Sequence, residues 1–141
     1  MNNSASPTRT PRIRYSIDFV RGQIKAIDDA ISRYTIREPF ITYRSIDTAA
    51  FYDKLDKFES LIGSEYSDEA FMSTTPDLNS PALNKDLFMT IKLPKSVGVG
   101  AYINDYNSLG ETEFLLARRL RFKITNAYKE KHYYYLEMEL L

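Results

Sequence analysis

The stretch Glu111-Thr112-Glu113-Phe114-Leu115-Leu116 decides the fold of this chain. It has the pattern of a strand that begins polar and turns apolar, directly after a turn rich in glycine, asparagine and serine at residues 104–110. Side chains alternate between the two faces of a strand, so Glu111 and Glu113 project to the same side. Two like charges so placed repel each other, and a fold by itself rarely requires them. The pair therefore predicts a cleft that holds two carboxylates.

Two further strand-like segments upstream end in polar groups. Phe40-Ile41-Thr42-Tyr43-Arg44 ends in a guanidinium, and the apolar part of Glu69-Ala70-Phe71-Met72-Ser73-Thr74-Thr75 closes in three hydroxyls. Arginine, a hydroxyl motif and the glutamate pair thus follow one another at three separate strand-like positions. Each motif alone is common, whereas the ordered set is specific.

Hydrophobic periodicity predicts helices first and strands later. A stripe with steps of three and four predicts a helix over residues 16–34, and a second helical run covers residues 48–62 and stops at Gly63. Alternation with period two predicts strands within residues 87–93, 120–124 and 136–140. We therefore expect an α+β fold, with N-terminal helices packed on a mainly antiparallel, two-layer β core.

Composition excludes several kinds of chemistry. The 141 residues contain no cysteine and one histidine, which argues against thiol nucleophiles, disulfides, a Ser-His-Asp triad and multi-histidine metal sites. Nineteen basic and nineteen acidic residues give a net charge of zero, so a nucleic-acid partner is not expected and a membrane surface is not indicated. A carboxylate mechanism acting on a small molecule or a protein is favoured.

The N-terminal residues are polar and punctuated by proline. They lack the apolar run of a signal peptide or membrane span, and they predict a disordered tail or linker over residues 1–12 ahead of one folded domain at residues 13–141. A domain taken from a longer polypeptide and a complete small protein remain equal alternatives.

In its three ordered motifs the chain resembles the mono-ADP-ribosyltransferases of the Arg-Ser-Glu class, among them actin-modifying clostridial binary toxins, insecticidal relatives and Rho-modifying exoenzymes. The segments 93–95, 100–103 and 122–125 resemble the family's strands around the glutamate pair. The resemblance implies an ADP-ribosyltransferase-like fold, NAD as co-substrate with no metal, and transfer of ADP-ribose to a protein such as actin or another target.

Chemistry assigns a task to Arg44 and Ser73 within that resemblance. A guanidinium can donate two parallel hydrogen bonds to the pyrophosphate of NAD, so Arg44 is the expected phosphate clamp; the alternative is an arginine paired with a surface carboxylate. Ser73 is expected to orient a carboxylate rather than attack, since no base accompanies it, and Thr74 is expected to contact NAD beside it. The alternative for these hydroxyls is capping of the turn at Pro76.

The two glutamates take different tasks. Breaking the bond between nicotinamide and ribose builds positive charge on the ribose, and a fixed carboxylate at Glu113 would stabilise that charge. The resemblance adds that the family's second glutamate binds a ribose hydroxyl. A guanidinium acceptor needs a base to take its proton, and family members that modify arginine carry glutamate at the first position. Glu111 therefore points to arginine as the acceptor.

Further candidates depend on weaker matches. In the loop 76–86, Lys85 could bind phosphate as a point charge and Leu83 could cover nicotinamide, with a plain solvent loop as the alternative. Arg21 matches a helical arginine by which some relatives contact NAD. Tyr106, with Leu109 as a substitute, matches the loop by which relatives recognise their target protein.

The resemblance also implies a biological setting and leaves other functions open. A bacterial toxin or effector would be secreted or delivered into a target cell and act in its cytosol, and an immunity protein could cover its cleft. A non-catalytic interaction module that recognises its partner through Tyr106, and an NAD glycohydrolase with water as the acceptor, remain alternatives. The glycohydrolase would not need Glu111.

Overall fold

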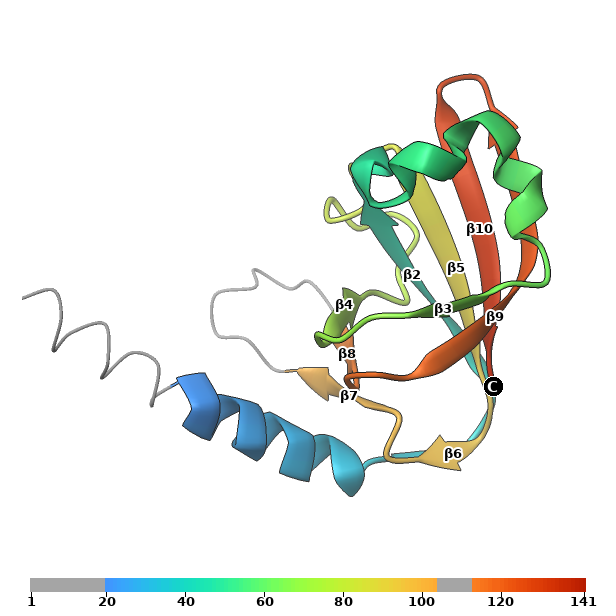
Figure 1. Cartoon of the computed structure of the whole chain (residues 1–141). Helices are drawn as coiled ribbons and strands as arrows, with labels where there is room; N and C mark the ends of the chain where they lie inside the picture. Colours follow the sequence, from blue (N-terminus) through green and yellow to red (C-terminus); the bar gives the residue numbers. More distant parts are fainter. Residues whose placement is uncertain (1–19, 104–112) are drawn as a thin grey trace, which may run out of the picture.

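Ten strands and two helical segments make up the described part of the computed structural model, which covers residues 20–103 and 113–141. The strands are β1 (Thr35–Ile36), β2 (Phe40–Ile46), β3 (Glu65–Ser67), β4 (Met72–Thr74), β5 (Leu87–Leu93), β6 (Ser96–Val97), β7 (Gly100–Ile103), β8 (Glu113–Leu116), β9 (Arg121–Glu130) and β10 (Tyr133–Leu140). A helix at residues 20–32 precedes them, and the helical segment η1 (Thr48–Leu61) follows β2. Figure 1 shows their arrangement.

The strands form a large sheet, a small sheet and a ribbon. The large sheet has the order β2-β5-β10-β9-β3, the small sheet has the order β4-β8-β7, and β1 pairs with β6. Among the described pairs, β5 and β10 run parallel and the others run antiparallel. The predicted α+β class with a mainly antiparallel core is confirmed.

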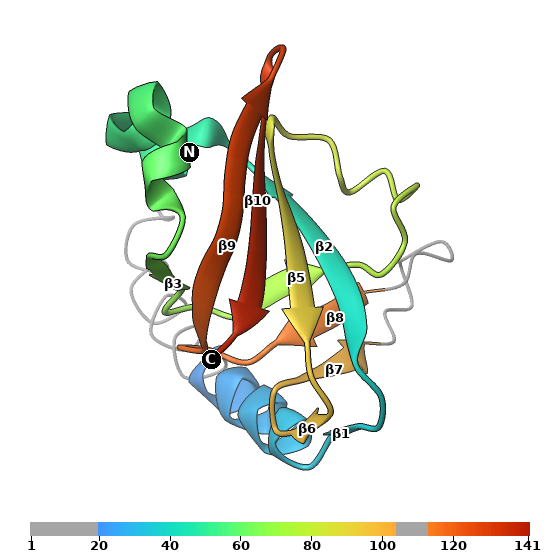
Figure 2. The same cartoon turned by 90° about the vertical axis from the view of Figure 1, so that its right-hand side faces the viewer.

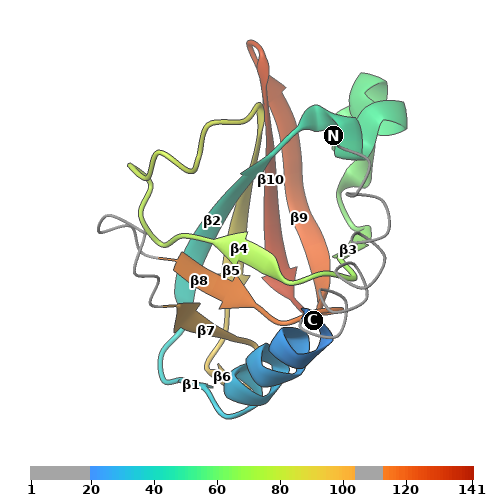
Figure 3. The same cartoon turned by 90° about the vertical axis from the view of Figure 1, so that its left-hand side faces the viewer.

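The core lies between the two sheets, because each turns an apolar face toward the other. In Figure 3 the small sheet lies in front of the large one, with β4 and β8 crossing the direction of β2 and β5. Alternate residues of β5 are buried, as period two predicts, and they join the buried Phe114 and Leu116 of β8 in one cluster. This packing brings β4 and β8 against the inner face of β2.

The N-terminal helix follows its predicted stripe from Ile24 on, whereas Val20, at the start of the described helix, is 50% exposed. Ile31 is buried, and Ile24 and Ile27 are half-buried. Residues 16–19 of the predicted helix lie outside the described residues. No helix in the described part is long and apolar enough to cross a membrane.

The second predicted helix is present at the expected place but differs in type. The segment η1 is a 3-10 helix with non-helical backbone angles at Phe51 and Lys57. Phe51 stacks on Tyr66, and Phe58 meets Tyr134 edge-on at 5.0 Å. The predicted apolar stripe is confirmed, because Phe51, Phe58 and Leu61 are buried, whereas the kinks were not predicted. After η1 the chain turns at Gly63, whose φ of 91° favours glycine.

The opposite face of the large sheet carries polar and aromatic side chains. Figure 2 looks onto this face, and no described helix or strand covers it. Neighbouring residues of β2 therefore point in opposite directions: Arg44 toward the small sheet, and Tyr43 toward this outer face.

Candidate active site

Arg44, Ser73 and Glu113 lie together at the junction of the two sheets. Arg44 Nη1 donates to the backbone oxygen of Ser73 at 2.9 Å. The Ser73 hydroxyl donates to Glu113 Oε2 at 2.6 Å. The three residues come from β2, β4 and the first position of β8, and other helical and strand segments lie between them in sequence. The convergence that the ordered motifs predicted is present in the structure.

The fold positions each member of this triad through strand register. Ser73 pairs with Leu115 in the antiparallel ladder of β4 and β8, which places Glu113 two residues away along β8, diagonally across the ladder. Tyr43, the neighbour of Arg44, exchanges two backbone hydrogen bonds of 2.8 Å with Thr75. The backbone pairing thus fixes the positions of the Cα atoms of all three residues.

One hydrogen-bond donor of Arg44 has no partner among the described residues. This donor is the Nε atom, which is buried. A buried polar atom without a partner is uncommon in folded proteins and requires an explanation. The pyrophosphate of NAD could accept from this group, so the arginine fits the co-substrate that the sequence predicted.

The triad faces solvent on one side. Ser73 is exposed, whereas Arg44 and Glu113 are half-buried. Burial raises the pKa of Tyr66 in β3 above its ordinary value, and the negative charge of Asp68 adds to this rise. The positive charge of Arg44 acts in the opposite direction and is the smallest of the three effects. Tyr66 could not be predicted from the sequence, because a lone tyrosine in a short strand gives no signal of a site.

Thr74 lies in the interior behind the triad. It is 3% exposed, and its hydroxyl donates to the backbone oxygen of Phe114 at 2.6 Å. The sequence predicted that Thr74 contacts NAD. Its burial favours a role in holding the strands together, because side chains alternate along β4 and Ser73 takes the solvent side.

The loop 76–86 is tied to the outer side of β2. The backbone nitrogen of Lys85 donates to Ser45 Oγ at 3.1 Å, and Ser45 Oγ donates to the backbone oxygen of Ala82 at 3.3 Å. Ser45 projects from the face of β2 opposite to Arg44. The backbone of this loop is therefore tied to the side of β2 opposite to Arg44, and the roles of Lys85 and Leu83 toward phosphate and nicotinamide stay predictions.

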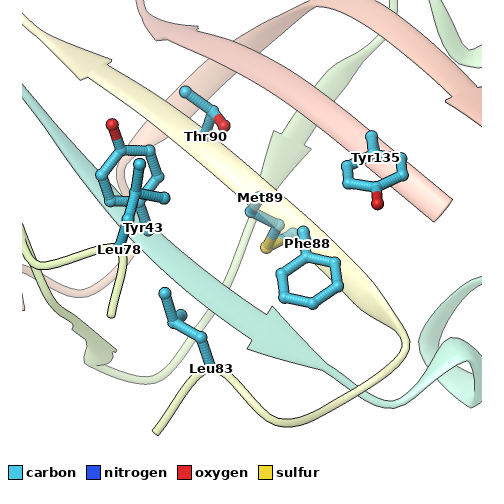
Figure 4. Close-up of a pocket in the computed structure, with 7 residues that line it drawn as sticks. All are labelled: Tyr43, Leu78, Leu83, Phe88, Met89, Thr90 and Tyr135. Atoms are coloured by element: carbon cyan, nitrogen blue, oxygen red, sulfur yellow. The ribbon is translucent and has the colours of Figure 1, made fainter. Parts of the chain in front are cut away.

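A pocket of about 270 Å³ lies on that outer face (Figure 4). Leu78 and Leu83 form one wall, and Tyr43, Thr90 and Tyr135 are among the residues of the sheet that line it. Of the predicted site residues, only Leu83 lines this pocket. The strand β2 separates it from the triad.

Arg21 lies on the exposed side of the N-terminal helix. Asp28, two helical turns further and therefore on the same face, accepts hydrogen bonds from Arg118 at 2.5 and 3.3 Å. Arg118 follows β8 and also lies over the ring of Phe71, just before β4. This contact orients the helix relative to the strands that carry Ser73 and Glu113.

Three predicted residues lie outside the described part of the chain: Glu111, Tyr106 and Leu109. The register of β8 begins at Glu113, so their roles stay predictions from the sequence.

A comparison with protein-family models matches residues 8–140 to the ADP-ribosyltransferase exoenzyme family. This chain belongs to that family. The match covers nearly the whole sequence and includes all three motifs, so the resemblance inferred from the sequence is confirmed. No curated protein matches the chain.

Several solved structures share the fold of this chain. C3larvin toxin from Paenibacillus larvae is 19% identical, with a TM-score of 0.65 over 98% of this chain and 84% of its own. C3stau2 from S. aureus with NAD is 16% identical, with a TM-score of 0.74 over 88% and 72% of the two chains. BECa, from a binary enterotoxin of C. perfringens, with NADH, is 20% identical, with a TM-score of 0.71 over 88% and 36%.

Proposed function

We propose that this exoenzyme cleaves NAD and transfers ADP-ribose to an arginine of a target protein. The observation that carries the proposal is the chain of hydrogen bonds from Arg44 through Ser73 to Glu113, which joins a phosphate-binding group to a carboxylate at one solvent-facing position. The solved relatives with NAD and NADH support a nicotinamide nucleotide as the substrate.

Arg44 would bind the pyrophosphate. One of its nitrogens is held by the Ser73 backbone, which fixes the plane of the guanidinium, and its buried Nε is left to donate to the ligand. The rigid, planar guanidinium can hold the Ser73 carbonyl and donate to a phosphate oxygen at the same time, which the single ammonium group of a lysine could not do with fixed geometry.

Glu113 would stabilise the ribose as its bond to nicotinamide breaks. The bonding electron pair leaves with nicotinamide, and the ribose carbon becomes positively charged. The Ser73 hydroxyl holds the Glu113 carboxylate in one orientation before the reaction begins, so the negative charge is preorganised at the place where positive charge develops.

Glu111 would complete the transfer. A guanidinium nitrogen of the target arginine bonds to the ribose carbon, and Glu111 takes the proton that this nitrogen must lose. The spacing of two from Glu113 along the strand pattern supports a position on the same side. Tyr106 or Leu109 would contact the target protein beside it.

The proposed setting is that of a toxin or effector that acts in the cytosol of a target cell, to which it is delivered. The solved relatives that are toxins by name support this setting. A producing cell would then need protection, for which an immunity protein that covers the triad is the simplest means.

Incubation of the protein with adenylate-labelled NAD and a cell lysate tests the function. Label on a protein band that hydroxylamine releases is the expected result, because ADP-ribose bound to arginine is labile to hydroxylamine. Release of nicotinamide without labelled protein would contradict transfer and favour a glycohydrolase. Binding of NAD with neither product would favour a non-catalytic module.

A further inference from the structure

The two sheets meet directly beside the triad. In the described part of the chain, an isolated bridge between Tyr43 and Thr75 joins β2 of the large sheet to the end of β4 in the small sheet. Arg44 stands on one side of this junction, and Ser73 and Glu113 stand on the other. The distance between the arginine and the glutamate therefore depends on how rigidly the two sheets are held at this point.

A second chain of hydrogen bonds crosses the same junction from the inside. Thr42 Oγ1 donates to Thr74 Oγ1 at 2.6 Å, and Thr74 Oγ1 donates to the backbone oxygen of Phe114 at 2.6 Å. Thr42 is two residues before Arg44, Thr74 directly follows Ser73, and Phe114 directly follows Glu113. The interior chain thus connects the same three strands as the triad itself.

Packing alone does not account for these hydroxyls. Thr42 is fully buried and pairs in register with Ile91, a residue of the apolar core. Valine has almost the same shape as threonine and would fill this site without a polar atom. Burial of a hydroxyl destabilises the fold unless the hydroxyl is hydrogen-bonded. The hydrogen bond to Thr74 is therefore what distinguishes threonine from valine at this position.

We propose that Thr42 is a positioning residue: its hydroxyl, acting through Thr74, holds β2 at a fixed distance from β8, so that Arg44 and Glu113 engage the two ends of the cleaved nucleotide together. The inference rests on the proposed cleavage of NAD and adds to it the residue that sets the spacing. Thr42 itself does not touch the substrate, since it is 0% exposed.

The expected effect falls on kcat rather than KM. Arg44 holds the pyrophosphate in the ground state and in the transition state alike, and this contact survives loss of the Thr42 hydroxyl. Glu113 acts when charge develops on the ribose, and a misplacement of about 1 Å costs up to about 100-fold in rate. Thr42→Val should therefore lower kcat for nicotinamide release at least about tenfold, with KM for NAD changed less than about threefold.

Matched variants separate positioning from stability. Thr42→Ser keeps the hydroxyl and should retain at least about half of the wild-type kcat. Thr125→Val removes a hydroxyl that donates to the Glu137 backbone at 3.1 Å, far from the triad in the strand order, and should keep wild-type kinetics. Thermal unfolding of each variant shows that the assays were made on folded protein. Should Thr42→Val not fold, Thr42→Ala, which removes the same hydroxyl without adding a methyl group, takes its place.

The outcomes distinguish this inference from the proposed function. A wild type that releases nicotinamide, together with a folded Thr42→Val variant of unchanged kcat, overturns the positioning role and leaves NAD cleavage standing. Equal loss of kcat in Thr42→Val and Thr42→Ser also overturns it, because the hydroxyl is then not responsible. A folded wild type that neither cleaves NAD nor labels protein overturns both.

Discussion

Ser73 and Glu113 are 40 residues apart in sequence and are joined by a hydrogen bond of 2.6 Å. The bond crosses the small sheet from β4 to β8, and the backbone of the same serine accepts from Arg44 at 2.9 Å. Ser73 thus contacts both charged members of the triad: its hydroxyl donates to Glu113, and its backbone carbonyl accepts from Arg44. The Ser73 hydroxyl has no adjacent base, and this arrangement gives it the task of orienting the Glu113 carboxylate.

Replacement of Ser73 by alanine should lower kcat for nicotinamide release by about 10- to 100-fold, because a hydrogen bond to a charged group contributes about 1.5–3 kcal/mol. The Arg44 contact uses the backbone and is retained, so KM for NAD should change little. Ser60→Ala is the control, since the Ser60 hydroxyl donates to the Lys57 backbone oxygen within η1 and not to a carboxylate. A rise in KM with kcat unchanged would contradict the orienting role.

Replacement of Arg44 by lysine should raise KM for NAD about tenfold. Lysine keeps the charge but cannot hold the Ser73 carbonyl and donate from a second fixed nitrogen at once. Steady-state kinetics and inhibition by ADP-ribose, which carries the same pyrophosphate, both report the change. Arg121→Lys, in an exposed ion pair with Glu65, is the control. Unchanged affinity for ADP-ribose in the Arg44 variant would remove this arginine from the phosphate site.

Gly100 of β7 should not tolerate a side chain. A Cβ at this position would lie 2.5 Å from the Phe114 ring and 2.8 Å from the Leu115 backbone oxygen. Gly100→Ala should lower the free energy of unfolding by about 1–3 kcal/mol, the usual cost of overpacking, and should disturb β8 next to Glu113. Denaturant unfolding measures the effect.

Gly22 provides the matched control for that substitution. A Cβ on Gly22 meets nothing within 4 Å, and the residue lies inside the N-terminal helix. Gly22→Ala should therefore raise the free energy of unfolding by about 0.5–1 kcal/mol. Equal effects of the two substitutions would show that the packing of β7 against Phe114 is looser than the structure indicates.

Asp28→Asn should loosen the contact between the N-terminal helix and the turn after β8. The Asp28 and Arg118 side chains are 37% and 30% exposed, so the pair is partly shielded from water, and we expect a loss of up to about 1 kcal/mol in unfolding free energy. Glu65→Gln, which breaks the more exposed pair with Arg121, should cost less. If Arg21 contacts NAD from the same helix, KM for NAD should also rise in the Asp28 variant alone. An unchanged KM would speak against that contact.

The strands that carry the triad could be predicted from the sequence, because the alternation of apolar and polar residues and the ordered motifs are local signals. The sequence was also sufficient for their convergence, which the family resemblance implied and the hydrogen bonds of Ser73 bear out. The 3-10 geometry of η1 could not be predicted, because its apolar residues have the spacing of a regular helix and nothing in that pattern marks the non-helical angles at Phe51 and Lys57. The interior placement of Thr74 and its bond from Thr42 depended on the meeting of two sheets, which no local pattern reports. For the same reason, the side of β2 to which the loop with Leu83 and Lys85 is tied could not be read from the sequence.

The most direct test of the central claim compares the wild type with Glu113→Gln and Glu111→Gln, using one preparation of labelled NAD with target lysate. We expect nicotinamide release and protein label from the wild type, neither from Glu113→Gln, and slow nicotinamide release without protein label from Glu111→Gln. Nicotinamide release by Glu113→Gln at the wild-type rate would contradict the account, because the carboxylate held by Ser73 would then have no part in breaking the bond.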